Sequence, residues 1–293
     1  MTPTNKKIGF VTSNDYADLT ESDRIAVNVL REKGMDTVPV IWDDSSVDWR
    51  SFDLLIIRST WDYHLHPGRF ASWLDTLELQ QATVWNPIHI IRWNMNKRYL
   101  LELERDGIQI PRTNFIGKNE SYDLSSLRSS LGTGNVVIKP VISASAWNTW
   151  RCSLDEFSET HRTRMNALLS EGDAMVQEFM PEIGTDGEWS LLFFGTEFSH
   201  AVRKFPADKD FRVQEELGGR YQIERNPPPL AICQARKALA LIHEPLLYAR
   251  VDGIMRNSMF IMMELELLEP ALFFDVEPAA AHRFTQRLID LTQ

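Results

Sequence analysis

Short apolar runs alternate with amphipathic stretches over the first ninety residues of the chain. Buried strands are predicted at residues 8–12, 37–41, 53–57 and 83–85, and helices at 20–34 and 70–77. Thr20-Glu-Ser-Asp23 has the composition of a helix start, and Gly34 provides the stop. Strands that alternate with helices form a parallel sheet with right-handed crossovers. This region therefore predicts a small doubly wound domain.

The pattern changes near residue 90, where the regular alternation ends. Further helices are predicted at 94–107, 153–170, 231–242 and 279–291, and strands at 136–139 and 173–179. An antiparallel hairpin is predicted at 188–194 and 199–204 after a loop over 180–187, and residues 208–221 predict a mobile loop. We expect an α/β (α+β) chain with an N-terminal domain over 1–90, a central subdomain over 91–176 and a C-terminal subdomain over 177–293.

Three carboxylates stand on two predicted strands near the end of the chain. A strand with Asp252, a turn near Arg256-Asn-Ser258 and a returning strand place Glu264 and Glu266 on one face. If Asp252 faces the same way, the three acids converge and need a cation. Oxygen ligands suit Mg²⁺ or Mn²⁺ bridged to substrate phosphates. A solvated acidic edge strand is the alternative, but the apolar residues between the acids favour the metal site.

A lysine at the end of an apolar strand is the second informative feature. Lys139 follows Val136-Val-Ile138 and precedes a loop of small residues that includes Ser143 and Ser145. Such a loop lets backbone N–H groups approach phosphate oxygens. Lys139 could instead extend its ammonium group to water, and Lys97 alone is a weaker candidate. Together the two lysines predict a phosphate site.

Polar residues also follow the third predicted strand. Arg58 and Asp62 lie at its carboxyl end, where open α/β sheets bind ligands. Arg203 and Arg212 add positive charge further along the chain. Enzymes of phosphoryl transfer use cations to bind phosphates and acidic side chains to bind a divalent metal ion. No Gly-x-Gly-x-x-Gly motif follows the first strand, so a dinucleotide fingerprint is absent.

Composition limits the partners and the compartment. The 293 residues carry 31 Lys and Arg against 41 Asp and Glu, a net charge of −10 that argues against nucleic acid or an anionic membrane. Only Cys152 and Cys233 are present, without metal-ligand spacing, and no apolar run is long enough to span a bilayer. We therefore expect a cytoplasmic protein. The tryptophans between residues 42 and 61 could form a homodimer face, but packing of these side chains in the core is the preferred interpretation.

The motifs, in their order along the chain, resemble those of the ATP-grasp superfamily, and most closely its glutathione-synthetase-like branch. The strings that carry the likeness are Ile138-Lys-Pro140, Val176-Gln-Glu-Phe-Met-Pro181, Asp186-Gly-Glu188, Arg203-Lys-Phe-Pro206, Asp210-Phe-Arg212, Gly218-Gly219, Arg250-Val-Asp252 and Glu264-Leu-Glu266. The resemblance covers about residues 90–275 and implies an ATP-grasp fold, with two α+β subdomains that grip ATP behind the N-terminal domain.

The resemblance implies roles for individual residues. Lys97 and Lys139 would bind the phosphates of the nucleotide, together with Ser143 and Ser145 in the phosphate loop. Adenine would lie against the hinge residues Gln177, Glu178, Phe179 and Met180. Glu188 would lie near the ribose. Asp252, Glu264 and Glu266 would hold Mg²⁺. Arg212 and Lys139 would stabilise the transferred phosphoryl group. Arg58, Asp62, Arg203, Arg212 and Glu269 form the expected substrate set, although Glu269 fits a cap or a salt bridge equally well.

Three strings look similar to the cyclo-ligase subfamily of D-cycloserine biosynthesis, which closes O-ureido-D-serine with ATP. They are Arg58-Ser-Thr-Trp-Asp-Tyr63, Arg92-Trp-Asn-Met-Asn-Lys97 and Glu264-Leu-Glu-Leu-Leu-Glu-Pro270. Two departures from the wider family stand out. Small residues replace its glycine-rich phosphate loop, and Trp189-Ser190 replaces the basic residue that glutathione synthetases carry after Gly187-Glu188.

The resemblance implies an ATP- and Mg²⁺-dependent carboxylate–amine or cyclo-ligase that acts on a small amino-acid-like substrate through an acyl phosphate. An ATP-binding sensor or interaction protein of the same fold, without ligase activity, is the alternative from a different class. A peptide- or protein-modifying ligase differs from the first hypothesis only in its acceptor.

Overall fold

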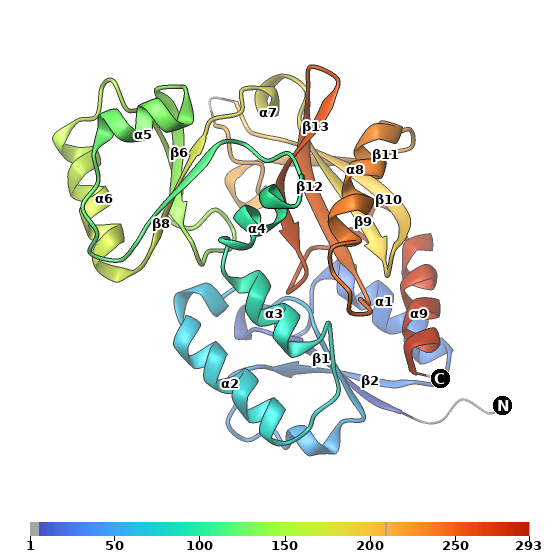
Figure 1. Ribbon diagram of the computed structural model, residues 1–293. Coiled ribbons are helices and arrows are strands. Elements are labelled where there is room, and N and C mark those ends of the chain that lie inside the picture. The colour runs from blue at the N-terminus through green and yellow to red at the C-terminus, as the bar shows by residue number, and fades with distance from the viewer. Residues whose placement is uncertain (1–5, 209, 293) are drawn as a thin grey trace.

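The computed structural model of the chain describes residues 6–208 and 210–292. Met1 to Asn5, ahead of the first expected strand, and Lys209, in the expected mobile loop, lie outside the described residues. Three sheets follow one another along the chain, and Figure 1 shows the N-terminal one below the other two. None of the described helices is long and apolar enough to cross a membrane.

The N-terminal domain is built on a parallel sheet with the strand order β2-β1-β3-β4. Its elements are β1 (Lys7–Thr12), α1 (Glu21–Glu32), β2 (Asp36–Ile41), β3 (Leu54–Ile57), α2 (Pro67–Leu79) and β4 (Val84–Trp85), with α3 (Ile88–Met95) after them. Alternate residues of β3 face opposite sides. Leu54 and Ile56 pack in the core that α1 shares with the C-terminal helix α9 (Ala279–Thr292), whereas Leu55 and Ile57 pack against α2 and α3. The expected doubly wound domain is confirmed.

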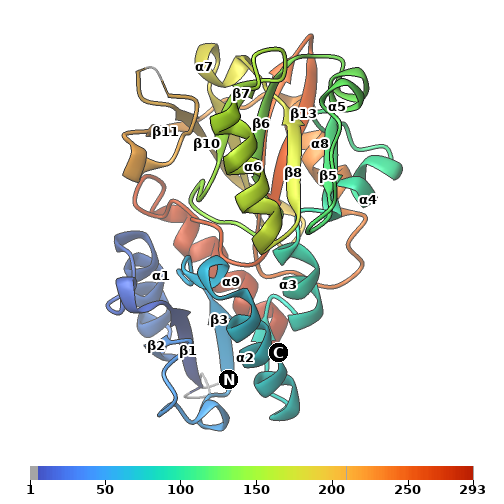
Figure 2. The ribbon, with the colours of Figure 1, turned by 90° about the vertical axis from the view of Figure 1, so that its left-hand side faces the viewer.

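The central subdomain carries an antiparallel sheet with the order β5-β8-β6-β7. Its elements are α4 (Tyr99–Arg105), β5 (Thr113–Ile116), α5 (Leu124–Leu131), β6 (Asn135–Pro140), β7 (Trp150–Ser153), α6 (Glu159–Glu171) and β8 (Ala174–Glu178). α5 and α6 share one core with this sheet, and Figure 2 shows α6 lying across β6 and β8. The boundary expected between residues 176 and 177 falls inside β8, so we propose a boundary after Glu178 instead.

The C-terminal subdomain carries a sheet with the order β11-β10-β9-β12-β13. Its elements are α7 (Glu182–Thr185), β9 (Glu188–Phe194), β10 (Glu197–Phe205), β11 (Arg220–Glu224), α8 (Pro229–Leu239), β12 (Ala249–Arg256) and β13 (Met259–Glu266). The β9–β10 hairpin and the β12–β13 pair are antiparallel, as expected. Asp252 pairs with Glu264 and Arg250 with Glu266, and a bulge follows Asp252. Gly253 sits at this bulge, where an added Cβ would lie 2.5 Å from the Ile261 oxygen.

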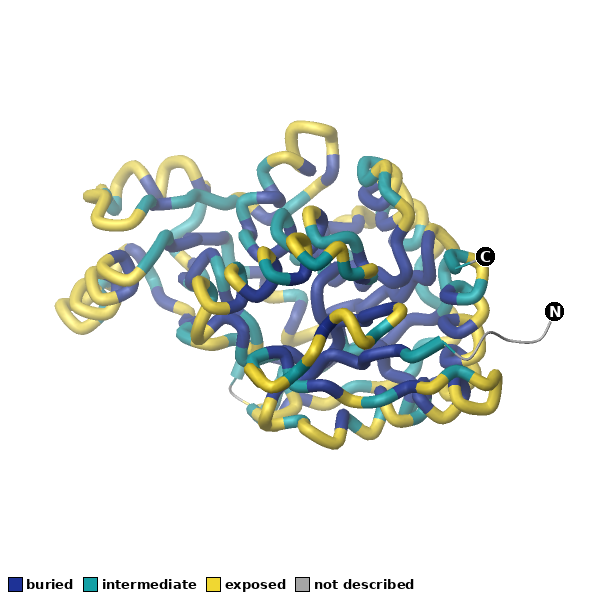
Figure 3. Tube along the Cα trace, turned by 90° about the horizontal axis from the view of Figure 1, so that it is seen from below, coloured by how far each residue is buried: buried dark blue, intermediate teal, exposed yellow. Residues whose placement is uncertain are grey.

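Some elements differ from expectation, and each difference has a local reason. The single helix expected at 94–107 is two helices, because the chain is extended at Asn96. Lys97 lies in this break and its N–H donates to the Val141 oxygen over 3.0 Å. The pattern also missed α3, α5, α7, β5, β7 and β11, which are short and carry no long periodic run. In Figure 3 the strands are mostly buried and the exposed residues gather on outer helices and loops.

Two buried asparagines join the N-terminal part of the chain to the C-terminal subdomain. The Asn86 side chain donates to the Tyr248 and Leu267 oxygens over 2.9 and 2.7 Å, and accepts from the Leu247 N–H over 2.8 Å. The Asn94 side chain donates to the Leu265 oxygen and accepts from the Leu267 N–H. These amides satisfy buried backbone groups just before β12 and at the end of β13, as buried polar groups require.

We expect Asn86→Ala to lower the free energy of unfolding by about 3 kcal/mol or more, because three buried backbone groups lose their partner. Urea unfolding measures the change. Asn166→Ala, at an exposed position of α6, is the matched control and should change stability by less than about 0.5 kcal/mol. Equal stability of the two variants would contradict the bridging role.

Candidate active site

A cavity of about 610 Å³ lies where the three parts of the chain meet, and residues from all three line it. Most of the expected site residues are among its lining: Arg58, Lys97, Lys139, Ser143, Ser145, Gln177, Glu178, Phe179, Met180, Glu188, Arg212, Asp252, Glu264, Glu266 and Glu269. The structure thus brings together residues that are up to 211 positions apart (269 − 58 = 211).

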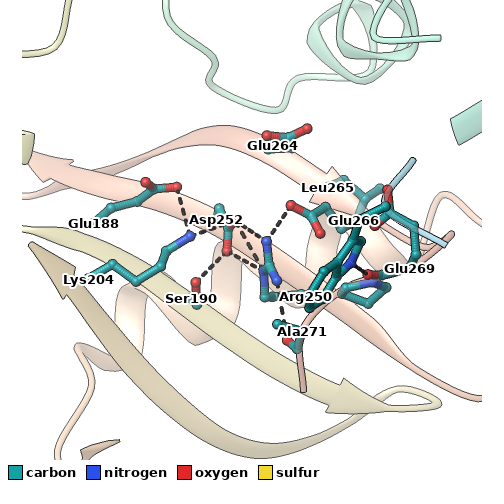
Figure 4. A network of polar contacts seen from close by, with 12 residues as sticks. Glu188, Ser190, Lys204, Arg250, Asp252, Glu264, Leu265, Glu266, Glu269 and Ala271 are labelled. Atoms are coloured by element: carbon teal, nitrogen blue, oxygen red, sulfur yellow. Dashed lines mark hydrogen bonds and ion pairs between the residues drawn. The ribbon is translucent and has the colours of Figure 1, made fainter. Parts of the chain in front are cut away.

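A buried network of ion pairs forms the floor of this cavity (Figure 4). Asp252 lies between two cations, with Lys204 Nζ and Arg250 Nη2 each 3.0 Å from its Oδ2, and Ser190 Oγ donates to Oδ1 over 2.6 Å. Burial disfavours the charge of Asp252, but Arg250 and Lys204 outweigh it and lower its pKa to about 2. Lys204 also contacts Glu188, where burial raises the carboxyl pKa. Asp252 therefore stays ionised inside the cavity.

The three acids expected as metal ligands are neighbours, but each is paired with a protein cation. Glu264 faces Lys97 with 2.5 Å between Oε1 and Nζ, and Glu266 forms an ion pair with Arg250. Burial raises the pKa of Glu266 to about 8, with Glu264 and Asp252 adding to the shift against the opposing effect of Arg250. The acidic side chains that line the cavity outnumber its lysines and arginines.

A fourth carboxyl group, Glu269, lines the same cavity. Burial raises its pKa to about 7, against the opposing effects of Lys97 and Arg250. Hydrogen bonds to Glu269 in the described ranges reach only its main-chain oxygen, which accepts from Trp61 Nε1 over 2.9 Å. It therefore adds to the excess of acid without a cation of its own.

Two lysines from different parts of the chain lie near the loop of small residues that follows β6. Lys97 donates to the Ser143 oxygen over 3.1 Å, and Glu264 outweighs the effect of burial so that the Lys97 pKa is raised. The Lys139 ammonium group makes no hydrogen bond or ion pair within residues 6–208 and 210–292, and burial lowers its pKa. An unpartnered lysine cation beside a loop of small residues suits an anionic ligand.

The loop itself has a conformation that glycine usually adopts. Ser145, Ala146 and Asn148 have φ values of 50°, 53° and 49°, in the left-handed region. Turn hydrogen bonds from the Trp147 N–H to the Ala144 oxygen and from the Thr149 N–H to the Ala146 oxygen hold this shape. Successive N–H groups in such turns form concave sites for anions.

The hinge after β8 leaves one buried donor without a partner. Met180 is 1% exposed, and its N–H makes no hydrogen bond to any described residue. The Glu178 N–H is already bonded to the Arg112 oxygen over 2.9 Å, so only its carbonyl is available. Met180 packs with Ile183, Val213 and Met263 in an apolar cluster. A flat apolar ring with an acceptor nitrogen, such as adenine, fits a slot of this kind.

Two expected substrate residues, Asp62 and Arg203, lie outside the cavity lining, and their role in substrate binding stays a prediction. Asp62 accepts a hydrogen bond from Trp42 Nε1 over 2.9 Å, and Arg203 lies over the Trp189 ring at 4.8 Å, facing Glu224. Arg58 does line the cavity, where it forms a 2.9 Å ion pair with Asp23 and leaves Nη1 without a partner among the described atoms. Arg212 is held by Asp210 at 2.8 Å.

Sequence reasoning did not assign Arg250 and Lys204 to the acids that they neutralise. Arg250 stands two residues before Asp252 on β12, so alternation places both side chains on one face. That spacing was a usable signal. Lys204 gave none, because its contact with Asp252 depends on how β9 separates β10 from β12 in the sheet.

Known proteins resemble this chain in sequence and in structure. Residues 8–86 match the family model described as the N-terminal domain of D-cycloserine synthetase DcsG. The cycloserine biosynthesis protein DcsG of Streptomyces lavendulae is 26% identical over 263 residues, covering 85% of this chain and 86% of that protein. The crystal structure of D-cycloserine synthetase DcsG superposes with a TM-score of 0.88 at 23% identity, covering 98% of this chain and all (100%) of that one.

A more distant structure shares the same architecture. D-alanine–D-alanine ligase from Bacillus anthracis, complexed with ATP, has a TM-score of 0.66 at 16% identity over 97% of this chain and 94% of its own. The chain is therefore an ATP-grasp-fold protein, and the expected fold is confirmed. Within that class it is a homologue of D-cycloserine synthetase DcsG.

We expect Lys139→Met to stabilise the ligand-free protein by about 1 kcal/mol, because the variant removes a desolvated charge that has no described partner. The melting temperature should rise. Lys118→Met, at an exposed position, is the control and should leave it unchanged. A lower melting temperature for Lys139→Met would show that the lysine contributes to the fold rather than to binding.

Proposed function

We propose that the protein is an ATP- and Mg²⁺-dependent ligase that joins a carboxylate to an amine, within one molecule or between two. The observation that carries the proposal is the meeting, in one cavity, of the unpartnered Lys139 with an excess of buried acids. Both features are unfavourable in the empty protein. A nucleotide triphosphate with its metal ion would satisfy them together.

The nucleotide would lie between the central and C-terminal sheets. Its adenine would occupy the apolar slot and accept a hydrogen bond from the Met180 N–H, with the Glu178 carbonyl as the acceptor for its amino group. Its phosphates would meet Lys97, Lys139 and the left-handed turn at Ser145. These contacts use groups that lack full partners in the described structure, apart from Lys97, which would share its charge with Glu264.

The metal ion would be held by Asp252, Glu264 and Glu266 together with phosphate oxygens. No group of three or more His, Cys, Asp or Glu side chains stands in a metal-holding arrangement within the described ranges 6–208 and 210–292. Mg²⁺ commonly uses one or two carboxylates and takes its other ligands from phosphates and water. The all-oxygen donor set and the excess of acid therefore fit this ion. When bound, it would neutralise phosphate charge.

The chemistry requires positioning rather than a protein nucleophile. A substrate carboxylate oxygen attacks the γ-phosphorus, and the bond to the ADP oxygen breaks, which gives an acyl phosphate. The amine nitrogen then attacks the acyl carbon, and phosphate leaves with the electron pair of its C–O bond. Lys139 and Arg212 would stabilise the transferred group. Arg212 would first leave Asp210, which lies two residues away on the same loop.

The relatives support this proposal at the level of the reaction class. One homologue is described as D-cycloserine synthetase, and a structure of the same fold is a D-alanine–D-alanine ligase complexed with ATP. Both names refer to compounds of amino-acid size. We extend that class to this chain, and the same reasoning favours a small molecule over a protein as the acceptor.

ATP binding gives the first test. In the wild-type protein, ATP·Mg²⁺ at a hundred times its Kd should stabilise the fold by about 2.7 kcal/mol. We expect Lys97→Met to weaken ATP binding at least tenfold, whereas Lys118→Met should leave it unchanged. Calorimetry measures both. A wild-type melting temperature that does not respond to ATP·Mg²⁺ would refute the proposal.

Turnover gives the second test. Wild-type protein should release ADP from ATP in the presence of pooled amino acids, and Arg212→Ala should reduce kcat by about a hundredfold with little change in ATP affinity. Arg220→Ala, at an exposed position of β11, is the matched control and should retain kcat. Tight ATP binding without ADP release from any substrate would favour a nucleotide-binding protein without ligase activity.

A further inference from the structure

The N-terminal domain carries a second cavity, of about 580 Å³, between the loop that follows β2 and one face of α2. Within the described residues, its lining and that of the candidate active site have no member in common. Its walls combine three tryptophans, Trp42, Trp49 and Trp73, with polar side chains from both segments. Cavities of this size and mixed lining are typical of sites for small molecules.

Trp73 offers a hydrogen-bond donor that the fold does not use. The residue is 7% exposed, and its Nε1 has no hydrogen-bond partner among the described residues. Its ring is held between Trp42 and Trp49, with centroid separations of 6.1 and 5.5 Å and interplanar angles of 62° and 66°. These edge contacts fix the orientation of the indole. Because buried indole N–H groups normally find a partner, this one points to an acceptor that a ligand supplies.

Two other buried indoles share the unpaired donor but not the cavity. Nε1 of Trp85 and of Trp150 also lacks a partner within the described ranges. Neither residue lines the second cavity, so a ligand bound there would reach the indole N–H of Trp73 and not theirs. Trp150 lies on β7 of the central subdomain and is 5% exposed, which makes it a matched control for Trp73.

Gln80 offers the complementary group on the same wall. Its side-chain oxygen is buried without a partner in the described part of the chain, and the residue lines the cavity. Gln80 follows Trp73 by seven residues, or about two helical turns, so α2 places both on one face. A ligand that satisfies both groups therefore carries an acceptor at one end and a donor at the other.

The rim of the cavity carries more acid than base. Asp43 and Asp44 line it together with Arg69. Arg69 Nη2 lies 3.1 Å from Asp43 Oδ2, whereas Asp44 accepts hydrogen bonds from the Ser46 N–H and hydroxyl over 2.8 and 2.7 Å. These hydrogen bonds lower the pKa of Asp44 and keep it ionised at neutral pH. The negative charge that remains repels anions, so phosphates and carboxylates are disfavoured as ligands.

We propose that the second cavity binds a small uncharged or cationic aromatic molecule with a hydrogen-bond acceptor at one end and a donor at the other. The aromatic ring would pack against the tryptophan walls, the acceptor would bond to Trp73 Nε1, and the donor would bond to Gln80. This site goes beyond the proposed ligase function and does not depend on it. 4-Aminobenzamide represents the ligand class, because its amide oxygen is an acceptor, its amine is a donor and it carries no charge.

The experiment follows the indole N–H signals of the full chain in ¹H–¹⁵N NMR spectra. Loss of one signal in Trp73→Phe assigns the Trp73 indole. In the wild type, 4-aminobenzamide should shift that signal downfield, because a new hydrogen bond forms, and the shift should persist in the presence of ATP·Mg²⁺. 4-Aminobenzoate has the same shape but is an anion, so it should bind at least tenfold more weakly.

Three variants make the result specific. Trp73→Phe keeps an aromatic ring but removes the N–H, so it should weaken binding of 4-aminobenzamide at least fivefold in ligand-observed NMR. Trp150→Phe makes the same change outside the cavity and should leave the affinity within twofold of wild type. Gly68 lines the cavity, and an added Cβ there meets nothing within 4 Å. Gly68→Leu should therefore fill the site and abolish binding, which provides a readout if Trp73→Phe does not fold.

Several outcomes would overturn this inference. An unchanged Trp73 signal at the solubility limit of 4-aminobenzamide is one, and equal affinity for 4-aminobenzoate is another. A shift that ATP·Mg²⁺ abolishes would place the ligand in the candidate active site instead. A Trp73 signal that moves with protein concentration, without ligand, would assign the cavity to contact with a second copy of the chain. The ligase proposal is unaffected by each of these results, because its own test is ATP binding.

Discussion

The pairing of β12 with β13 is the constraint on which the site depends. It places Asp252 opposite Glu264 and Arg250 opposite Glu266, so one arginine faces two acids inside the cavity. Neither charge would be tolerated there alone, because an uncompensated buried ion costs several kcal/mol. The bulge at Gly253 fixes this register, since alternation then puts all four side chains at the cavity. A shift by one residue would exchange them for apolar neighbours.

The cations that balance these acids come from separate parts of the fold. Lys97 lies in the break between α3 and α4, Lys139 ends β6, Lys204 belongs to β10 and Arg250 to β12. The cavity therefore acquires its cations only when the segment between α3 and α4, the central sheet and the C-terminal sheet have come together. That balance is incomplete, because the acidic side chains that line the cavity outnumber its lysines and arginines. The ligand-free cavity is therefore less stable than one in which every charge is neutralised. A bound polyanion and a metal ion would restore that stability, as is common at sites that bind charged ligands.

The sequence was most informative where a short-range pattern determines the structure. The parallel N-terminal sheet followed from its apolar runs, and the closeness of Glu264 and Glu266 on one face followed from alternation along β13. The placement of Asp62 and Arg203 could not be predicted in this way. Asp62 accepts a hydrogen bond from Trp42, which lies 20 residues earlier on another segment, and Arg203 lies over Trp189 because the register of the β9–β10 hairpin makes the two residues cross-strand neighbours. The same holds for Lys204, whose partner Asp252 lies on a strand 48 residues away.

The loop after β6 carries small non-glycine residues where the wider family has a glycine-rich loop. A glycine-rich loop would reach the left-handed region without strain, whereas Ser145 and Ala146 do so at a cost of about 1 kcal/mol each. Such strain persists only where the surroundings hold it. Here the Trp147 ring lies 5.4 Å from His64 of the N-terminal domain, and Lys97 bonds to the Ser143 oxygen. Because non-glycine residues have fewer accessible conformations, the loop is held in one shape, and less ordering entropy would be lost if an anionic ligand bound there.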